Sequence, residues 1–257
     1  MTQIHPVTSV PIVPLRPQPD GRWSVVGAVA FVAAIMAVSM LAAFLLQTWH
    51  GAWYASLDAS ERLDVPSPGS AEVLVPIQLF AQMVQAVLIW SLAGIWHADR
   101  RAALNLRPAG LSGQQWLGAI GILFAVKIGA TLVAAGVVQP QAPRDAGPFT
   151  ELVRSDRMWL LFLATVVMAG LTEELLFRGV LSRTLEGTAI GFWAGAALAS
   201  AAFALLHLQY GVDGQLVIFA VGMAFAWIRS WSGSVWPAVA VHALNNALAL
   251  LIMRAMV

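Results

Sequence analysis

Long apolar runs are the feature of this chain that most restricts its fold. The chain has 257 residues, of which 59% are hydrophobic and 11% are charged. A soluble domain carries about 25% charged residues, so this composition indicates an integral membrane protein. A run of about 20 apolar residues can cross a bilayer as a helix, because a helix satisfies its own backbone polar groups. The sequence therefore predicts an all-α, polytopic bundle of transmembrane helices with about seven or eight spans.

The first run is free of charged residues from Ser24 to Trp49, which is longer than the apolar region of a signal peptide. The short sixth run is expected to be tilted, or to end in a partly buried turn at the string SWSGS. The predicted spans, in chain order, are Val25–Thr48, Val73–Trp96, Trp116–Val138, Met158–Leu181, Ala189–Leu208, Gly214–Ile228 and Val235–Met253.

The chain divides into three predicted regions. Residues 1–21 are rich in proline and predict a disordered tail. Residues 22–150 hold the N-terminal transmembrane helices, and residues 151–257 hold a core in which polar side chains interrupt the apolar runs. If the N-terminus is cytoplasmic, that side of the membrane carries eight arginines and the other side carries five. Because cytoplasmic loops are enriched in Arg and Lys, this count favours a cytoplasmic N-terminus. We expect the membrane to be the inner (plasma) membrane of a bacterium.

Two adjacent acidic residues, Glu173 and Glu174, lie at the end of the run MWLLFLATVVMAGLTEELLFRGVL. An ionisable group at mid-membrane costs about 2.5–3.5 kcal/mol on insertion scales, so such a group is a functional candidate by default. Glu174 and Arg178 are four residues apart with the acid first, which is the favourable order for an ion pair on a helix. Glu173 points about 100° away from Glu174. We therefore expect Glu174 and Arg178 to align helices, and Glu173 to be free to act as a general base on water.

Three further polar residues lie in later apolar runs: His207, His242 and Asn246. His207 shares a predicted helix face with Phe203, which would form the wall of a pocket beside the imidazole. His242 and Asn246 are also four residues apart and share a face. An imidazole and an amide can supply hydrogen-bond donors to an oxyanion, although both could instead form an interhelical polar contact. His242 follows Val235 closely, so it reaches the depth of Glu173 only if the turn before it is buried.

The strings EELLFR, FALLH and HALNN occur in this order over the last four spans. Together they resemble the three motifs of the CPBP family of intramembrane proteases. That family comprises the CAAX prenyl endopeptidases of the Ras-converting type and bacterial relatives, some of them linked to bacteriocin processing or immunity. The resemblance covers about residues 158–250 and leaves the first 150 residues uncovered.

The resemblance implies an intramembrane endopeptidase without a cofactor or metal. It implies Glu173 as the base that activates water and His207 as its partner. It implies His242 and Asn246 as the groups that stabilise the oxyanion. The expected partners are the lipid bilayer and a peptide or membrane-anchored protein substrate. A net charge of +1 gives no reason to expect nucleic acid.

Two alternatives remain open on the sequence. One is a zinc peptidase in which Glu173, His207 and His242 bind the metal together with water, a ligand set that suits zinc. The absence of cysteine excludes thiolate ligands and a cysteine nucleophile. The other is a non-enzymatic immunity or transport protein that uses the polar cluster structurally or as a proton relay. Lys127 interrupts the third span, and the sequence gives it no role.

Overall fold

The computed structural model describes residues 23–138 and 146–256, and helices dominate both ranges. The disordered tail expected for residues 1–21 lies outside the described residues. Within these ranges six helices are long and apolar enough to cross a membrane, which confirms the predicted polytopic bundle. They are α1 (Val25–Ser56), α2 (Ala71–Trp96), α4 (Gly113–Val137), the composite helix Met158–Glu186, α10 (Val212–Ser232) and α11 (Trp236–Met256). Shorter helices are η1 (Glu61–Leu63), α3 (Arg100–Ala103), α5 (Ala146–Arg154) and α9 (Gly191–Leu205).

The lengths of the fifth and sixth predicted spans are reversed in the structure. Helix α9 has 15 residues and ends at Leu205, where the backbone N–H groups of Leu206 and His207 bond to carbonyls three residues back. Helix α10 has 21 residues and continues through Arg229. The sequence suggests that Arg229 ends the span, but its charge is neutralised inside the protein by Glu186. The helix can therefore extend beyond the apolar run.

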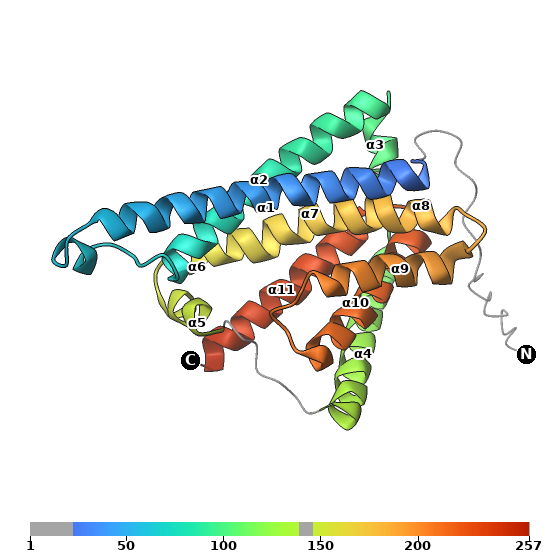
Figure 1. Ribbon diagram of the computed structural model, residues 1–257. Helices are drawn as coiled ribbons and strands as arrows, with labels where there is room; N and C mark the ends of the chain where they lie inside the picture. Colours follow the sequence, from blue (N-terminus) through green and yellow to red (C-terminus); the bar gives the residue numbers. More distant parts are fainter. Residues whose placement is uncertain (1–22, 139–145, 257) are drawn as a thin grey trace, which may run out of the picture.

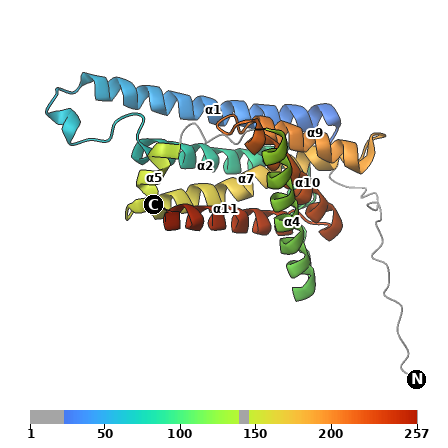
Figure 2. The same ribbon diagram turned by 90° about the horizontal axis from the view of Figure 1, so that it is seen from below.

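Figures 1 and 2 show how the long helices are arranged. Helix α1 runs along the composite helix, and α2 packs against both. Helix α4 is steeply inclined to α1 and to the composite helix in both views, and it packs against α10. Helix α11 packs against the composite helix and α10. The centre of the composite helix is thereby enclosed by the other spans.

The composite helix Met158–Glu186 is not a regular α-helix. The segments α6 (Met158–Leu161), α7 (Gly170–Glu174) and α8 (Arg183–Glu186) are α-helical. The two segments between them, η2 (Phe162–Ala169) and η3 (Leu175–Ser182), have π-helical hydrogen bonding. Local π-helical geometry inside α-helices occurs frequently at functional sites. Here the two π-helical segments lie on either side of the acidic pair Glu173–Glu174 at the end of α7.

Two packing features bring the acidic pair next to α11. At Gly170, a Cβ atom would lie 3.5 Å from the backbone nitrogen of Ala243, which is ordinary van der Waals contact, so α7 and α11 pack directly against each other there. The turn before α11 contains Gly233 in the left-handed region, at φ +70°. Beyond it, Ser234 and Val235 are fully buried, and Val235 N–H donates to the Asn105 carbonyl at 3.0 Å. The turn is therefore partly buried, since Ser234 and Val235 lie inside the protein while Gly233 and Trp236 are exposed.

Helices α8 and α9 are in closer contact than any side chain at Gly195 would permit. A Cβ atom at Gly195 would lie 2.5 Å from the backbone nitrogen of Glu186, whereas one at Gly121 in α4 would meet nothing within 4 Å. We expect Gly195→Ala to destabilise the protein by about 1–3 kcal/mol, because overpacking forces the two helices apart. Gly121→Ala is the matched control and gains about 1 kcal/mol of helix propensity. The unfolding temperatures in detergent measure both effects, and equal values for the two variants would contradict this close contact.

Candidate active site

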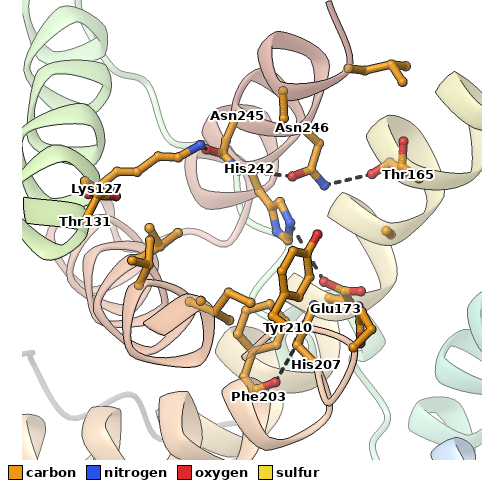
Figure 3. Close-up of a pocket in the computed structure, with 18 of the residues that line it drawn as sticks. Lys127, Thr131, Thr165, Glu173, Phe203, His207, Tyr210, His242, Asn245 and Asn246 are labelled. Atoms are coloured by element: carbon orange, nitrogen blue, oxygen red, sulfur yellow. Dashed lines mark hydrogen bonds and ion pairs between the residues drawn. The ribbon is translucent and has the colours of Figure 1, made fainter. Parts of the chain in front are cut away.

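A pocket of about 660 Å³ opens between α4, α7, α9, α10 and α11. Its lining includes all four residues that the sequence analysis selected as catalytic, namely Glu173, His207, His242 and Asn246. They come from α7, from the turn after α9 and from α11, so the fold brings together residues up to 73 positions apart. Figure 3 shows these four side chains around the pocket. The lining does not include Glu174 or Arg178.

The two adjacent carboxylates have different environments. The Glu174 side chain is fully buried, and its Oε1 lies 3.1 Å from Arg178 Nη1 and 2.9 Å from His242 Nδ1. The Glu173 side chain is 27% exposed and borders the pocket. The predicted Glu174–Arg178 ion pair is therefore present. The contact of Glu174 with His242 was not predicted, because sequence spacing along one helix says nothing about residues on another.

His242 lies between the two carboxylates. Since an ionised carboxylate only accepts hydrogen bonds, Nδ1 of His242 carries a proton and donates it to Glu174. The other ring nitrogen, Nε2, lies 3.8 Å from Glu173 Oε2. The ring is stacked on Phe225, with the centroids 4.8 Å apart and the planes inclined by 19°. Glu174 and Phe225 thus fix the rotation of the imidazole, and they direct its Nε2 side towards Glu173.

Arg178 is held from two sides as well as by its ion pair. It is 1% exposed, and its Cζ lies 4.3 Å from the ring centroid of Phe203 and 5.3 Å from that of Phe225. A guanidinium over an aromatic face is attracted by the ring quadrupole, more strongly where water is excluded. Phe203 also contacts His207, with ring centroids 4.7 Å apart, and it lines the pocket. Phe203 therefore forms a pocket wall and also contacts the buried ion pair.

His207 is half-buried and lies in the turn just past the end of α9 rather than within a helix. Its Nδ1 is 2.9 Å from the carbonyl oxygen of Phe203. A carbonyl oxygen only accepts, so this nitrogen carries the proton and the neutral ring has its lone pair on Nε2. His207 and His242 therefore have Nδ1 occupied in the same way, one by a carbonyl and the other by a carboxylate.

Asn246 lies one turn beyond His242 on α11 and borders the same pocket. Its Nδ2 donates to the carbonyl oxygen of Thr165 at 2.8 Å, and its Oδ1 accepts from Asn245 Nδ2 at 3.1 Å. Thr165 lies in the π-helical segment η2, whose geometry therefore influences the position of the Asn246 amide.

Tyr210 is a site residue that the sequence analysis missed. It lies in the loop between α9 and α10 and lines the pocket beside His242 and Glu173 (Figure 3). Burial, and secondarily the charge of Glu173, raise the pKa of the Tyr210 phenol. The phenol is therefore protonated at neutral pH and can donate a hydrogen bond into the pocket. Only its sequence position three residues after His207 could have suggested this location.

A second buried ion pair corrects the sequence analysis. Arg229 follows the end of the predicted sixth span and was counted among the eight cytoplasmic arginines, but Arg229 and Glu186 are both buried and paired, and Ser182 donates to the same carboxylate. Arg178 and Arg229 are thus interior residues rather than loop charges. Two of the eight arginines that were assigned to the cytoplasmic side therefore do not count as loop charges, which weakens the support for a cytoplasmic N-terminus.

The geometry also bears on whether these residues could hold a metal. Over the described ranges 23–138 and 146–256, no group of three or more His, Cys, Asp or Glu side chains is close enough to hold a metal ion. Glu173 and His242 approach each other, and Nδ1 of His242 and Nδ1 of His207 are both engaged by protein oxygen atoms, an arrangement that is also common for metal-bound histidines. The pocket therefore places the Glu173 carboxylate among imidazole and amide groups, and Asp213 also lines it.

The fold and the pocket define a polytopic helical membrane protein with ionisable groups gathered inside its bundle. Residues 155–248 match the family model described as type II CAAX prenyl endopeptidase Rce1-like. The segment that carries the four selected residues is therefore similar to this family of CAAX-type membrane proteases, which confirms the resemblance of its three motifs. The matched segment does not include α1, α2 or α4. Comparisons with curated proteins and with solved structures gave no match.

Proposed function

We propose that this chain is an intramembrane endopeptidase in which Glu173 activates the water that attacks a peptide carbonyl. The observation that carries the proposal is the difference between the two carboxylates. Glu174 is buried and engaged by Arg178 and His242, whereas Glu173 is exposed to the pocket. A general base must be reachable by water and substrate. Of the two adjacent acids, Glu173 alone meets that requirement.

The surroundings of the two histidines support distinct roles, because Nδ1 of His242 is bonded to a buried carboxylate and Nδ1 of His207 to a backbone carbonyl. In the proposed reaction, Glu173 takes a proton from water while the water oxygen attacks the carbonyl carbon, and the carbonyl oxygen becomes an oxyanion. His207 has an acceptor at Nε2 and assists Glu173 in handling that proton. His242 and Asn246 supply N–H donors to the oxyanion, His242 from Nε2 when its ring carries both protons. The proton on Glu173 then passes to the leaving nitrogen as the C–N bond breaks.

We expect cleavage to be independent of an added metal. A zinc site would need Glu173, His207 and His242 as ligands, and it would then use the proposed base as a ligand. Purified enzyme should keep its activity after treatment with a zinc chelator such as 1,10-phenanthroline, and its zinc content should be well below one atom per chain. Stoichiometric zinc, with activity lost to the chelator and restored by metal, would favour the zinc peptidase instead.

The substrate class can be tested with the substrate type named in the family's description. We propose a peptide or a membrane-anchored protein as substrate. A quenched fluorescent CAAX peptide with a farnesylated cysteine, and the same peptide without the lipid, would show whether a prenyl group is required. Comparison of membrane peptides in a deletion strain and its parent would identify natural substrates, because uncut forms should accumulate in the deletion strain.

We further propose that the N-terminus lies on the cytoplasmic side of a bacterial inner membrane. The chain has no cysteine, so single cysteines introduced into connecting loops report their own accessibility without a background signal. A cysteine at Ser67, in the connection between α1 and α2, should react with an impermeant maleimide added to intact cells. A cysteine at Ser112, the residue that precedes α4, should be protected until the cells are opened. The reverse pattern would contradict the proposed orientation.

A further inference from the structure

Lys127 is a charged residue within a membrane span that the proposed mechanism does not use. It is the only lysine of the chain and lies near the middle of α4, outside the segment that matches the family. A charge at such a position costs about 2.5–3.5 kcal/mol on insertion scales, so it calls for a partner or a function. In the described part of the chain, no carboxylate lies within ion-pair distance of Lys127. Its Nζ donates instead to Asn245 Oδ1 at 2.7 Å.

This hydrogen bond begins a chain that ends at the pocket residue Asn246. Asn245 Nδ2 donates to Asn246 Oδ1 at 3.1 Å, and Asn246 Nδ2 donates to the Thr165 carbonyl at 2.8 Å. Figure 3 shows Lys127 reaching from α4 to Asn245, with Asn246 turned towards Thr165. The chain therefore connects three membrane helices through three side chains and one backbone carbonyl.

The chemistry of the two ends fixes the direction of every hydrogen bond in this chain. An ammonium group only donates, so the oxygen of the Asn245 amide must face Lys127. A carbonyl oxygen only accepts, so the nitrogen of the Asn246 amide must face Thr165. The Asn245 nitrogen and the Asn246 oxygen are then left facing each other. All donors point from Lys127 towards Thr165, and no amide can rotate without placing two acceptors or two donors in contact.

We propose that Lys127 is a positioning residue that acts on Asn246 through Asn245. This inference rests on the proposed role of Asn246 at the oxyanion. The Asn246 Nδ2 group has two N–H bonds, of which the Thr165 carbonyl takes one. Lys127 holds the amide so that the second N–H remains a donor for the pocket. Its positive charge also polarises both amides in the same direction, which strengthens the last donor of the chain.

A spectroscopic test is possible because the chain has only three asparagines, Asn105, Asn245 and Asn246. Selective ¹⁵N labelling of asparagine gives three side-chain amide signals in detergent micelles, assigned by single substitutions. We expect Lys127→Met to shift the amide signals of both Asn245 and Asn246, while Asn105 serves as an internal reference. Lys127→Arg keeps the charge and the donors and should preserve the wild-type pattern more closely. A shift confined to Asn245 would overturn the proposal.

Kinetics separates a positioning role from a direct contact with substrate. With the farnesylated CAAX peptide as probe, Lys127→Met should lower kcat about tenfold, which corresponds to the loss of one oriented hydrogen bond, and change KM less than about twofold. Asn245→Ala breaks the chain without removing the charge and should have the same effect. The double variant Lys127→Met/Asn245→Ala should be no slower than Asn245→Ala alone, because both substitutions interrupt the same chain of hydrogen bonds to Asn246.

The decisive comparison is made in an Asn246→Ala background. If Lys127 acts through Asn246, Lys127→Met should cause no further loss there. A rise in KM, or a further tenfold loss in that background, would show that Lys127 contacts substrate directly and would overturn the proposal. If Lys127→Met does not fold, Lys127→Gln and Asn245→Ala decide the question by the same comparison. A wild-type protein that cleaves neither peptide would instead refute the proposed function, and the asparagine spectra would still decide whether the chain orients Asn246.

Discussion

Glu173→Gln should abolish peptide cleavage while the folded protein remains intact. A glutamine has nearly the same shape as glutamate but cannot take a proton from water. General-base catalysis typically contributes about 10²–10⁴-fold to the rate, so a loss of this size is expected. Because Glu173 borders the pocket and is not engaged by Arg178, its neutralisation leaves the buried ion pair in place. The unfolding temperature and the elution profile in detergent should therefore remain close to those of wild type.

The measurement is single-turnover cleavage of the CAAX peptide by purified variants with matched folding. Glu72→Gln is a suitable control, since Glu72 forms an exposed ion pair with Arg157 at the start of α2 and lies outside the pocket. It should cleave at the wild-type rate. A wild-type rate for Glu173→Gln would refute the assignment of Glu173 as the base. A non-enzymatic immunity or transport protein would show no cleavage, in the wild type or in any variant. In that case a deletion strain would not accumulate uncut peptides.

The apolar runs predicted most of the fold, because helix length and hydropathy are local properties of the sequence. The two main differences concern α9 and α10. Helix α10 extends past its apolar run because Arg229 forms an ion pair with Glu186 on a different helix, and no local pattern in the sequence indicates such a partner. The π-helical segments around Glu173 and Glu174 were also not predicted from the apolar runs, which indicate a helix but not its hydrogen-bonding pattern.

The site residues could be selected from the sequence because polar side chains are rare inside apolar spans. The contacts between these residues could not be predicted from the sequence. The spacing of Glu174 and Arg178 indicated one ion pair, but the position of His242 against Glu174 depends on the packing of α7 against α11 and on the burial of Ser234 before α11. Lys127 remained without a role for the same reason, since its partner Asn245 lies on another helix and 118 positions away.

Removing either member of the buried Glu174–Arg178 pair should mainly damage folding. Arg178→Ala leaves a fully buried carboxylate beside His242 without its cation, and it also removes the guanidinium between Phe203 and Phe225. Breaking a buried pair by removing one partner typically costs about 3–5 kcal/mol. Glu174→Ala should be similarly destabilising, because it leaves a buried guanidinium uncompensated. Low yield or a clearly lowered unfolding temperature is expected for each single variant.

The exposed pair of Glu72 and Arg157 provides the matched comparison for this effect. Its atoms lie 2.7 Å apart, but the two side chains are 40% and 58% exposed. Exposed ion pairs contribute about 0–1 kcal/mol, so Arg157→Ala should barely change the unfolding temperature. Since Glu174 does not line the pocket, Glu174→Ala should lower the cleavage rate only by changing the orientation of His242. If Glu174→Ala or Arg178→Ala has normal yield and stability but no activity, then Glu174 takes part in the chemistry itself, and the division of roles between the two carboxylates must be reversed.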